Sequence, residues 1–396
     1  PWVQGLTGGC RCSWPVLSPQ GSLVFLVSGL VVLGYAAALS AQRTYQGVVR
    51  AVCGAAVGKL CEVCFLLNLF MISVALLRVV GDQLEKLCDS LYPNGTLSGA
   101  PPAPPWYADQ RFTLSALCIL VIFPLSVPRE IGFQKYSSIL GTLAACYLTL
   151  VIVLKYHLQA ESRGSPKPPQ PPRASSWASV FSVIPTICFG FQCHEACVAI
   201  YSSMRNQSFS RWVAVSVLSM LICLLIYSLT GLYGYLTFGE AVAPDVLMSY
   251  PGNDPVVIVA RLLFGVSIVT IYPIVVLLGR SVVRDVWASP KRGAVAVPEA
   301  QERQSRVALT VTWMAATLAI ALFVPDIGKV IELIGGISAF FIFIFPGKSE
   351  QREGGEHRCG WRGLRAALIA WGVLSVLGGA FVCGQSAALA VLGLLR

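Results

Sequence analysis

Long apolar stretches alternate with short polar ones along most of the chain. Most stretches hold about 20 apolar residues, the number that crosses the hydrocarbon core of a bilayer as a helix. The residues between them include Gly, Pro, Asn and charged side chains, which end helices. The pattern therefore predicts ten membrane-spanning helices, of which the third and ninth are short for a full crossing. The predicted spans are 22–41, 56–81, 112–127, 136–156, 178–201, 212–237, 255–279, 307–325, 330–346 and 366–392.

Lys and Arg concentrate in alternate loops, beginning with the loop at 42–55. Basic residues favour the cytoplasmic side of a membrane, so these loops, including 280–306, are expected to be cytoplasmic. The loop at 238–254 falls on the opposite side and holds acidic residues without Lys or Arg. The proline-rich loop at 157–177 is also expected outside, as an extended spacer.

A glycosylation sequon, Asn94-Gly-Thr, lies in the loop at 82–111, which this orientation places outside. Glycosylation of Asn94 is therefore predicted, since such sequons are used on exposed loops. A plain tight turn at Asn94-Gly is the alternative, because this dipeptide favours turns.

The composition agrees with a membrane protein. The chain of 396 residues is 55% hydrophobic and 12% charged, and its mean hydropathy is +0.69. Soluble domains carry about 25% charged residues. The net charge of +10 is spread over short loops, which argues against a nucleic-acid partner. The 14 cysteines lie mostly in apolar runs and show no zinc-binding spacing, so no metal site is expected.

One predicted span has an unusual composition. The stretch from Ser182 to Glu195 carries Pro185, Gly190, Gln192 and His194 in addition to its apolar residues. Irregular backbone inside a membrane requires partners from protein or from a water-lined cavity. Many transporters use such discontinuous helices to hold substrate and ions. The alternative is an ordinary span with a kink at Pro185 and a frayed end at His194.

The residues of this stretch resemble those of a known family. Pro185-Thr, followed by Phe189, Phe191, Cys193-His and Ile200-Tyr, resembles the sixth-span signature of the sodium-coupled neutral amino acid transporters. These proteins form solute carrier family 38, within the amino acid/auxin permeases. Further matches in the same order are Thr44–Arg50, Tyr136–Gly141, Tyr233–Gly239, Asp245–Pro251 and Ile334–Ser338.

The resemblance implies an all-α polytopic membrane protein with a LeuT-like inverted-repeat bundle of eleven spans. About ten are visible here, and the family's first span, the partner of the broken sixth, has no match. Residues 1–21 are then an atypical N-terminal segment, and residues 22–392 form the transporter domain. A second departure follows Pro346, where polar residues replace an apolar continuation. The ninth span, at 16 residues from Val330 to Phe345, would reach only about 24 Å.

The resemblance also directs attention to the backbone around Gly190 as a substrate site. Phe189, Gly190, Phe191 and Gln192 are expected to bind the amino acid, since free amides at a helix start attract a carboxylate and free carbonyls attract an ammonium group. The Gln192 side chain would bind a polar substrate side chain. A hydrogen bond from Gln192 to a neighbouring helix is an equal alternative.

The pair His194 and Glu195 has two interpretations. His194 is a possible pH sensor, because imidazole changes charge near neutrality, and Glu195 would modulate it. The preferred interpretation is a pair at a span end, at the cytoplasmic interface.

For sodium, the resemblance points to the span at 255–279. Ser267 and Thr270 are three residues apart and share a helix face, which suits oxygen ligands for Na⁺. Hydroxyls in membrane helices also bond to their own backbone, and this alternative stays open. Arg261, near the outer end of this span, is expected to reach the interface with its long side chain.

No catalytic constellation is present in the sequence, so an enzyme is not expected. The resemblance implies a secondary transporter that moves neutral amino acids such as glutamine with Na⁺ across the plasma membrane by alternating access. It needs no cofactor besides the coupling ion, and its partners are the amino acid, Na⁺ and lipid. A non-transporting amino acid sensor and a truncated, non-functional isoform are the alternatives.

Overall fold

The structure is a computed structural model that describes residues 14–91, 109–128, 132, 134–163, 177–243, 245–287, 299–324, 327–348 and 362–395. Within these ranges the regular secondary structure is helical, as predicted, and nine helices are long and apolar enough to cross a membrane. A tenth apolar helix, Gln110–Ser126, is shorter. It matches the predicted short third span. Helices are expected here because each satisfies its own backbone hydrogen bonds in lipid.

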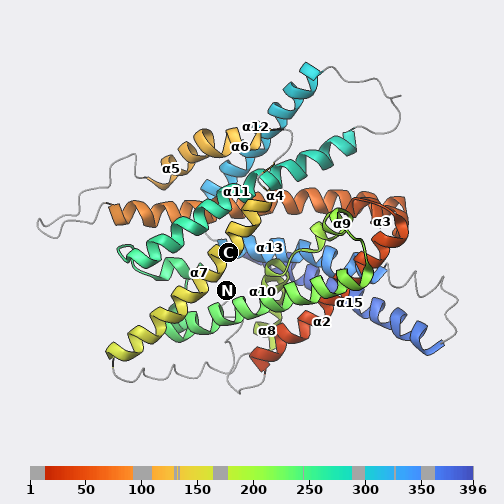
Figure 1. Cartoon of the computed structure of the whole chain (residues 1–396), viewed down its shortest axis with the longest axis horizontal. Helices are drawn as coiled ribbons and strands as arrows, with labels where there is room; N and C mark the ends of the chain where they lie inside the picture. The colour runs from red at the N-terminus through yellow and green to blue at the C-terminus, as the bar shows by residue number, and fades with distance from the viewer. Residues whose placement is uncertain are drawn as a thin grey trace, which may run out of the picture. The chain divides into compact units, whose positions relative to one another are not determined.

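The chain divides into two compact units, each described by itself. The first comprises Pro1–Asn68, Pro169–Leu232 and Gly328–Arg396. Helix α2 packs against α9, α3 and the π-helical turn η5, and α15 packs against η5 and α8 (Figure 1). The helices of this unit are α2 (Trp14–Ser40), α3 (Tyr45–Cys53), the first part of α4 (Ala55–Leu91), α8 (Trp177–Gly190), α9 (His194–Ser203), most of α10 (Phe209–Phe238), α13 (Ile327–Ala339), η5 (Phe340–Ile344) and α15 (Arg362–Leu395).

The second unit comprises Leu69–Pro168 and Tyr233–Ile327. Helices α7 and α11 pack along one another, and α11 also contacts α6 and α12. Its helices, besides the second part of α4, are α5 (Gln110–Leu117), the π-helical turn η2 (Cys118–Ile122), α6 (Phe123–Ser126), α7 (Gln134–Arg163), the 3₁₀ turns η3 (Gly239–Ala241) and η4 (Val246–Ser249), α11 (Pro255–Trp287) and α12 (Glu299–Phe323).

One predicted boundary was wrong. The ninth span is not short, because α13, η5 and one further turn run without a break from 327 to 348, a helix about 33 Å long. The π-helical turn η5 continues this helix after Ala339, the last residue of α13. The first predicted span, 22–41, matches the apolar segment Leu23–Ser40 of α2, a helix that begins at Trp14. Most of the polar segment at 347–365, like most of the proline-rich loop, lies outside the described residues.

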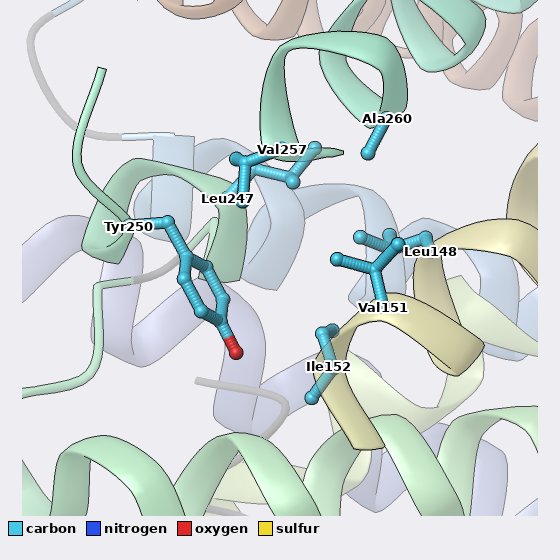
Figure 2. Close-up of a cluster of buried hydrophobic side chains, with 7 residues drawn as sticks. All are labelled: Leu148, Val151, Ile152, Leu247, Tyr250, Val257 and Ala260. Atoms are coloured by element: carbon cyan, nitrogen blue, oxygen red, sulfur yellow. The ribbon is translucent and has the colours of Figure 1, made fainter. Parts of the chain in front are cut away.

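The segment between α10 and α11 folds back onto helices α7 and α11, within the second unit. Tyr250 and Leu247 pack against Leu148, Val151 and Ile152 of α7 in an apolar cluster (Figure 2). Val257 and Ala260 of α11 complete this cluster. Burial of these side chains fixes the segment to the helices beneath it.

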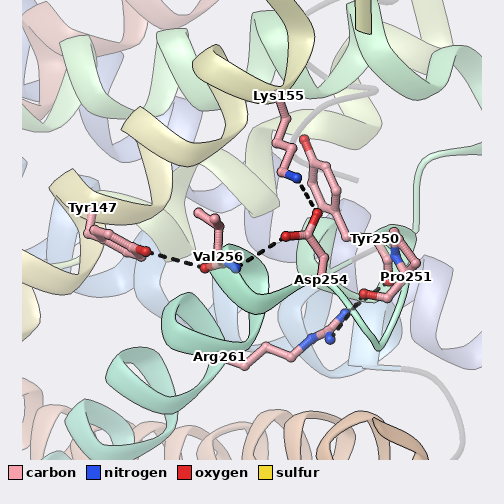
Figure 3. Close-up of polar contacts among 7 residues, drawn as sticks. All are labelled: Tyr147, Lys155, Tyr250, Pro251, Asp254, Val256 and Arg261. Atoms are coloured by element: carbon pink, nitrogen blue, oxygen red, sulfur yellow. Dashed lines mark hydrogen bonds and ion pairs between the residues drawn. The ribbon is translucent and has the colours of Figure 1, made fainter. Parts of the chain in front are cut away.

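Arg261 holds the backbone of the same segment. Its guanidinium, on a fully buried residue, donates to the Leu247 carbonyl at 3.0 Å. It also donates to the carbonyls of Tyr250 at 2.9 Å and Pro251 at 3.4 Å (Figure 3). Nearby, Asp254 pairs with Lys155 of α7. The prediction that Arg261 reaches the membrane interface was therefore wrong, because carbonyls of a folded loop bind the charge within the protein.

Candidate functional site

The apolar helix over Val183–Ser203 is broken near its middle. Helix α8 ends at Gly190, α9 begins at His194, and Phe191, Gln192 and Cys193 between them are not helical. The turn is tight, since the Phe191 amide donates to Ile187 at 3.1 Å and the Gln192 amide to Phe189 at 3.3 Å. The prediction that the chain unwinds after Gly190 is confirmed, and the alternative of a simple kink was wrong.

Two contacts fix the end of α8 at this break. The Tyr227 hydroxyl of α10 donates to the Gly190 carbonyl at 3.2 Å, and its ring packs edge-on against Phe191 with centroids 5.2 Å apart. One turn of α8 away from the break, Gly335 of α13 lies against Pro185. A Cβ atom at Gly335 would lie 1.8 Å from the Pro185 carbonyl oxygen, so only glycine allows this approach.

The other half of the break begins without help from a side chain. Cys193 is the N-cap of α9 and its side chain makes no capping hydrogen bond. The first amides of a helix have no intrahelical acceptor, and they carry the positive end of the helix dipole. This helix start can therefore receive an anionic group.

Gln192 is part of a chain of polar side chains drawn from three helices and the break. Its Oε1 accepts a hydrogen bond from Ser338 of α13 at 2.6 Å, and its Nε2 donates to Glu195. Asn68 of α4 donates to the same Glu195 oxygen. The structure thus contains the bond to a neighbouring helix that was one of the two expectations for Gln192.

His194 ties α9 to α2. The residue is fully buried, and its Nε2 donates to the Leu26 carbonyl at 2.9 Å. Gly29 makes room for the ring, since a Cβ there would lie 3.0 Å from Nε2. The preferred interpretation of His194 as part of a span-end pair at the membrane interface was wrong, because the residue lies at the break, within the span.

The residues expected to bind sodium belong to the second unit. The Thr270 hydroxyl donates to the Ser267 carbonyl at 2.8 Å and lies 2.8 Å from the Ser137 hydroxyl of α7. Ser267 is buried, and a Cβ at Gly141 would come within 3.1 Å of its hydroxyl oxygen. Thr270 thus makes the bond to its own helix that was the alternative to a sodium site.

Other expectations concern residues of different kinds. Asn94 lies outside the described residues. In the part of the chain that the structure describes, no three or more His, Cys, Asp or Glu residues gather in a way that suits a metal ion.

The sequence did not single out Tyr227, Ser338 or Asn68 as residues of the site. Their only signal was a polar group within an apolar span, which does not show which neighbour it meets.

Comparison with known proteins identifies the family. Residues 24–394 match the family described as transmembrane amino acid transporter protein. The chain belongs to this family. It is 60% identical to human solute carrier family 38 member 8 over 395 residues, which covers 99% of the chain and 89% of that protein. It is 45% identical to the mouse sodium-coupled neutral amino acid transporter 7, covering 94% of the chain and 80% of that protein.

A solved structure shows the same architecture. The crystal structure of MhsT in complex with L-phenylalanine matches with a TM-score of 0.57 at 15% identity, over 99% of this chain and 93% of that one. The transmembrane amino acid transporter described here therefore has the LeuT-like helical fold. With its apolar helices, the family places it among integral, multi-pass membrane proteins.

Proposed function

We propose that this protein is a secondary active transporter that moves neutral amino acids, glutamine among them, together with Na⁺ across the plasma membrane. The observation that carries the proposal is the break at 191–193 in a span of an amino acid transporter family member. The name of the mouse relative, sodium-coupled neutral amino acid transporter 7, supports sodium coupling and neutral substrates.

The break offers chemistry that suits an amino acid. The uncapped start of α9 fits the substrate carboxylate, since its amides and dipole attract negative charge. The carbonyls at the end of α8, around Phe189 and Gly190, fit the ammonium group. Phe191 and Gln192 lie between the two ends and are proposed to contact the substrate side chain. Ser267 and Thr270 remain the proposed sodium ligands of the second unit.

The transport step is proposed to follow alternating access. A site at a helix break can open to either side when one group of helices rocks against the other, and the sodium gradient then drives accumulation. His194 has a second proposed role as a pH-responsive group beside Glu195.

The test is uptake of labelled glutamine by cells that express this chain, measured in sodium and in choline buffer. Uptake that needs sodium and saturates with glutamine supports the proposal. A sensor that binds without transport would show thermal stabilisation by glutamine and no uptake. Absence of both would indicate a non-functional isoform. Gln192→Ala is expected to weaken glutamine uptake more than alanine uptake, because the amide contact serves only the polar side chain.

A further inference from the structure

Glu195 presents a carboxylate inside a membrane-spanning helix. It lies in the first turn of α9, within the span Val183–Ser203, and is only half-buried. Carboxylates at this depth are costly unless they are paired, and they mark ion or substrate pathways. The ion pairs found in the described residues are Arg50–Glu62, Arg78–Asp82, Lys155–Asp254 and Arg284–Glu302, so none of them includes Glu195.

The groups that hydrogen-bond to the Glu195 carboxylate carry no positive charge. Asn68 and Gln192 donate amide hydrogens to one carboxylate oxygen. Neither of these groups is cationic in any protonation state.

Asn68 gives an independent indication of a missing ligand. The residue is fully buried, and its side-chain oxygen Oδ1 has no hydrogen-bond partner in the described part of the chain. A buried carbonyl oxygen without a partner is unfavourable, because it has lost its hydrogen bonds to water. Because the amide nitrogen of Asn68 is bonded to Glu195, the unpartnered oxygen lies close to the carboxylate.

A carboxylate and an amide oxygen form a pair of hard oxygen ligands. Hard cations bind through such oxygens. We infer that Glu195 and Asn68 form a binding site for a monovalent cation in the first unit, separate from Ser267 and Thr270. The cation is Na⁺ or the ammonium group of the amino acid, which share this chemistry.

The inference rests on the proposed function for its use in transport, but binding is measurable without transport. The experiment is thermal unfolding of the purified full-length chain in detergent, with NaCl titrated against choline chloride at constant ionic strength. A ligand that binds only the folded state stabilises it by RT ln(1 + [L]/Kd), so the rise of the unfolding temperature with sodium concentration gives the dissociation constant. Thr270→Val is used as the background, so that any contribution from Ser267 and Thr270 is reduced.

Sodium is expected to stabilise this background. Glu195→Gln keeps the shape of the side chain and removes its charge. It is expected to raise the dissociation constant for sodium by about tenfold or more, a loss of at least 1.4 kcal/mol of binding free energy. Asn68→Ala removes the second oxygen and is expected to act in the same direction. The matched control is Glu62→Gln, which changes a glutamate of α4 that pairs with Arg50 and is expected to leave the titration unchanged.

The two sources of the cation give different results. If sodium stabilisation survives in Glu195→Gln but labelled glutamine binds at least tenfold more weakly in choline buffer, the ligand is the ammonium group. If both titrations match the background, the inference is wrong. Where Glu195→Gln yields no folded protein, Glu195→Asp and Asn68→Ala replace it. The first is expected to keep a weakened response and the second to lose it, and two unchanged responses overturn the inference.

The outcome is distinguishable from that of the proposed function. If the chain shows no uptake but its stability still responds to sodium through Glu195, the cation site is supported and the transport proposal is contradicted. Sodium-driven uptake that is unchanged in Glu195→Gln retains transport and removes the site.

Discussion

Two irregular segments interrupt the helices, and their backbones are satisfied in different ways. In the second unit, three carbonyls of residues 245–251 accept hydrogen bonds from one fully buried guanidinium, that of Arg261. In the first unit, the break at 191–193 receives one side-chain bond to a carbonyl, from Tyr227, while the start of α9 has no side-chain cap. The comparison teaches that irregular backbone alone does not indicate a binding site. The segment whose polar groups remain available is the better candidate.

The strongest test removes the guanidinium. Arg261→Met is expected to destabilise the protein by roughly 3 kcal/mol or more, because the change leaves buried carbonyls without donors. Lys at this position is not expected to restore stability, since an ammonium group cannot reproduce the planar fork of donors. Unfolding in detergent, followed by circular dichroism, measures the effect. Arg284→Met is the control, because Arg284 is 58% exposed in its pair with Glu302 and should cost less than 1 kcal/mol. Equal losses for the two variants would refute the anchoring role.

The second test concerns the close packing beside the break. Gly335→Ala places a methyl group against the Pro185 carbonyl and is expected to cost about 1–3 kcal/mol, because α8 and α13 must separate. Gly378→Ala, in α15 of the same unit, meets nothing within 4 Å and is expected to be neutral or slightly stabilising. The readout is the unfolding temperature of each purified variant. If the Gly335 variant is as stable as the Gly378 variant, α8 and α13 do not meet as described.

The third test compares one tyrosine hydrogen bond from each unit, Tyr227 to Gly190 and Tyr147 to Val256. Tyr227→Phe removes the hydroxyl bond to Gly190 and is expected to cost about 1 kcal/mol, while the aromatic contact with Phe191 persists. Tyr147→Phe removes a longer, exposed bond of 3.3 Å to Val256 and is expected to cost less. Hydrogen exchange at residues 187–196 and 254–260 reports each loss locally. A larger effect at Tyr147 would reverse the ranking of the two contacts.

The smallest effect is a pH dependence of the anchored segment. Burial raises the pKa of Asp245 from 3.8 to about 6, and nearby Asp82 adds to this, against lowering by the Leu247 amide, Arg261 and Gln83. A carboxyl whose folded pKa is raised binds its proton more tightly when folded. The segment therefore gains stability as the pH falls through about 6, with about 1 kcal/mol gained between pH 7 and pH 5.

Hydrogen exchange at residues 245–251, corrected for the intrinsic rate at each pH, measures this gain. Asp245→Asn has no titrating proton at the site and is expected to show the same protection at both values of pH. A variant with the same pH dependence as the original chain would assign the effect to another group.

Much of the fold was predictable because its signal is local. Apolar runs of sufficient length predict helices wherever lipid is the solvent, and nine of the ten predicted spans appear as helices long enough to cross, in the described part of the chain. The break was also predictable, since Gly190, Gln192 and His194 are unfavourable in a plain span. The end of the ninth span at Lys348 was less so, because helix ends depend on neighbours that local composition does not specify.

The polar contacts were not predictable from the sequence. Arg261 has the same local pattern whether it reaches lipid head groups or binds loop carbonyls, and the choice depends on how the segment at 245–251 folds back. His194 was expected at an interface, but α2 and Gly29 enclose it. The chain of Ser338, Gln192, Glu195 and Asn68 joins residues far apart in sequence, and no periodicity predicts such a meeting.

The sequence by itself determined that this chain forms membrane helices, which of them breaks, and which family it resembles. The helices and the break follow from burial and backbone chemistry that act within about one helix turn or one span, and the resemblance follows from the order of the sequence motifs. Only the tertiary structure decided which polar side chains satisfy one another across helices. It therefore decided that Arg261 is an anchor, and that Glu195 and Asn68 retain oxygens for which the described residues supply no cation.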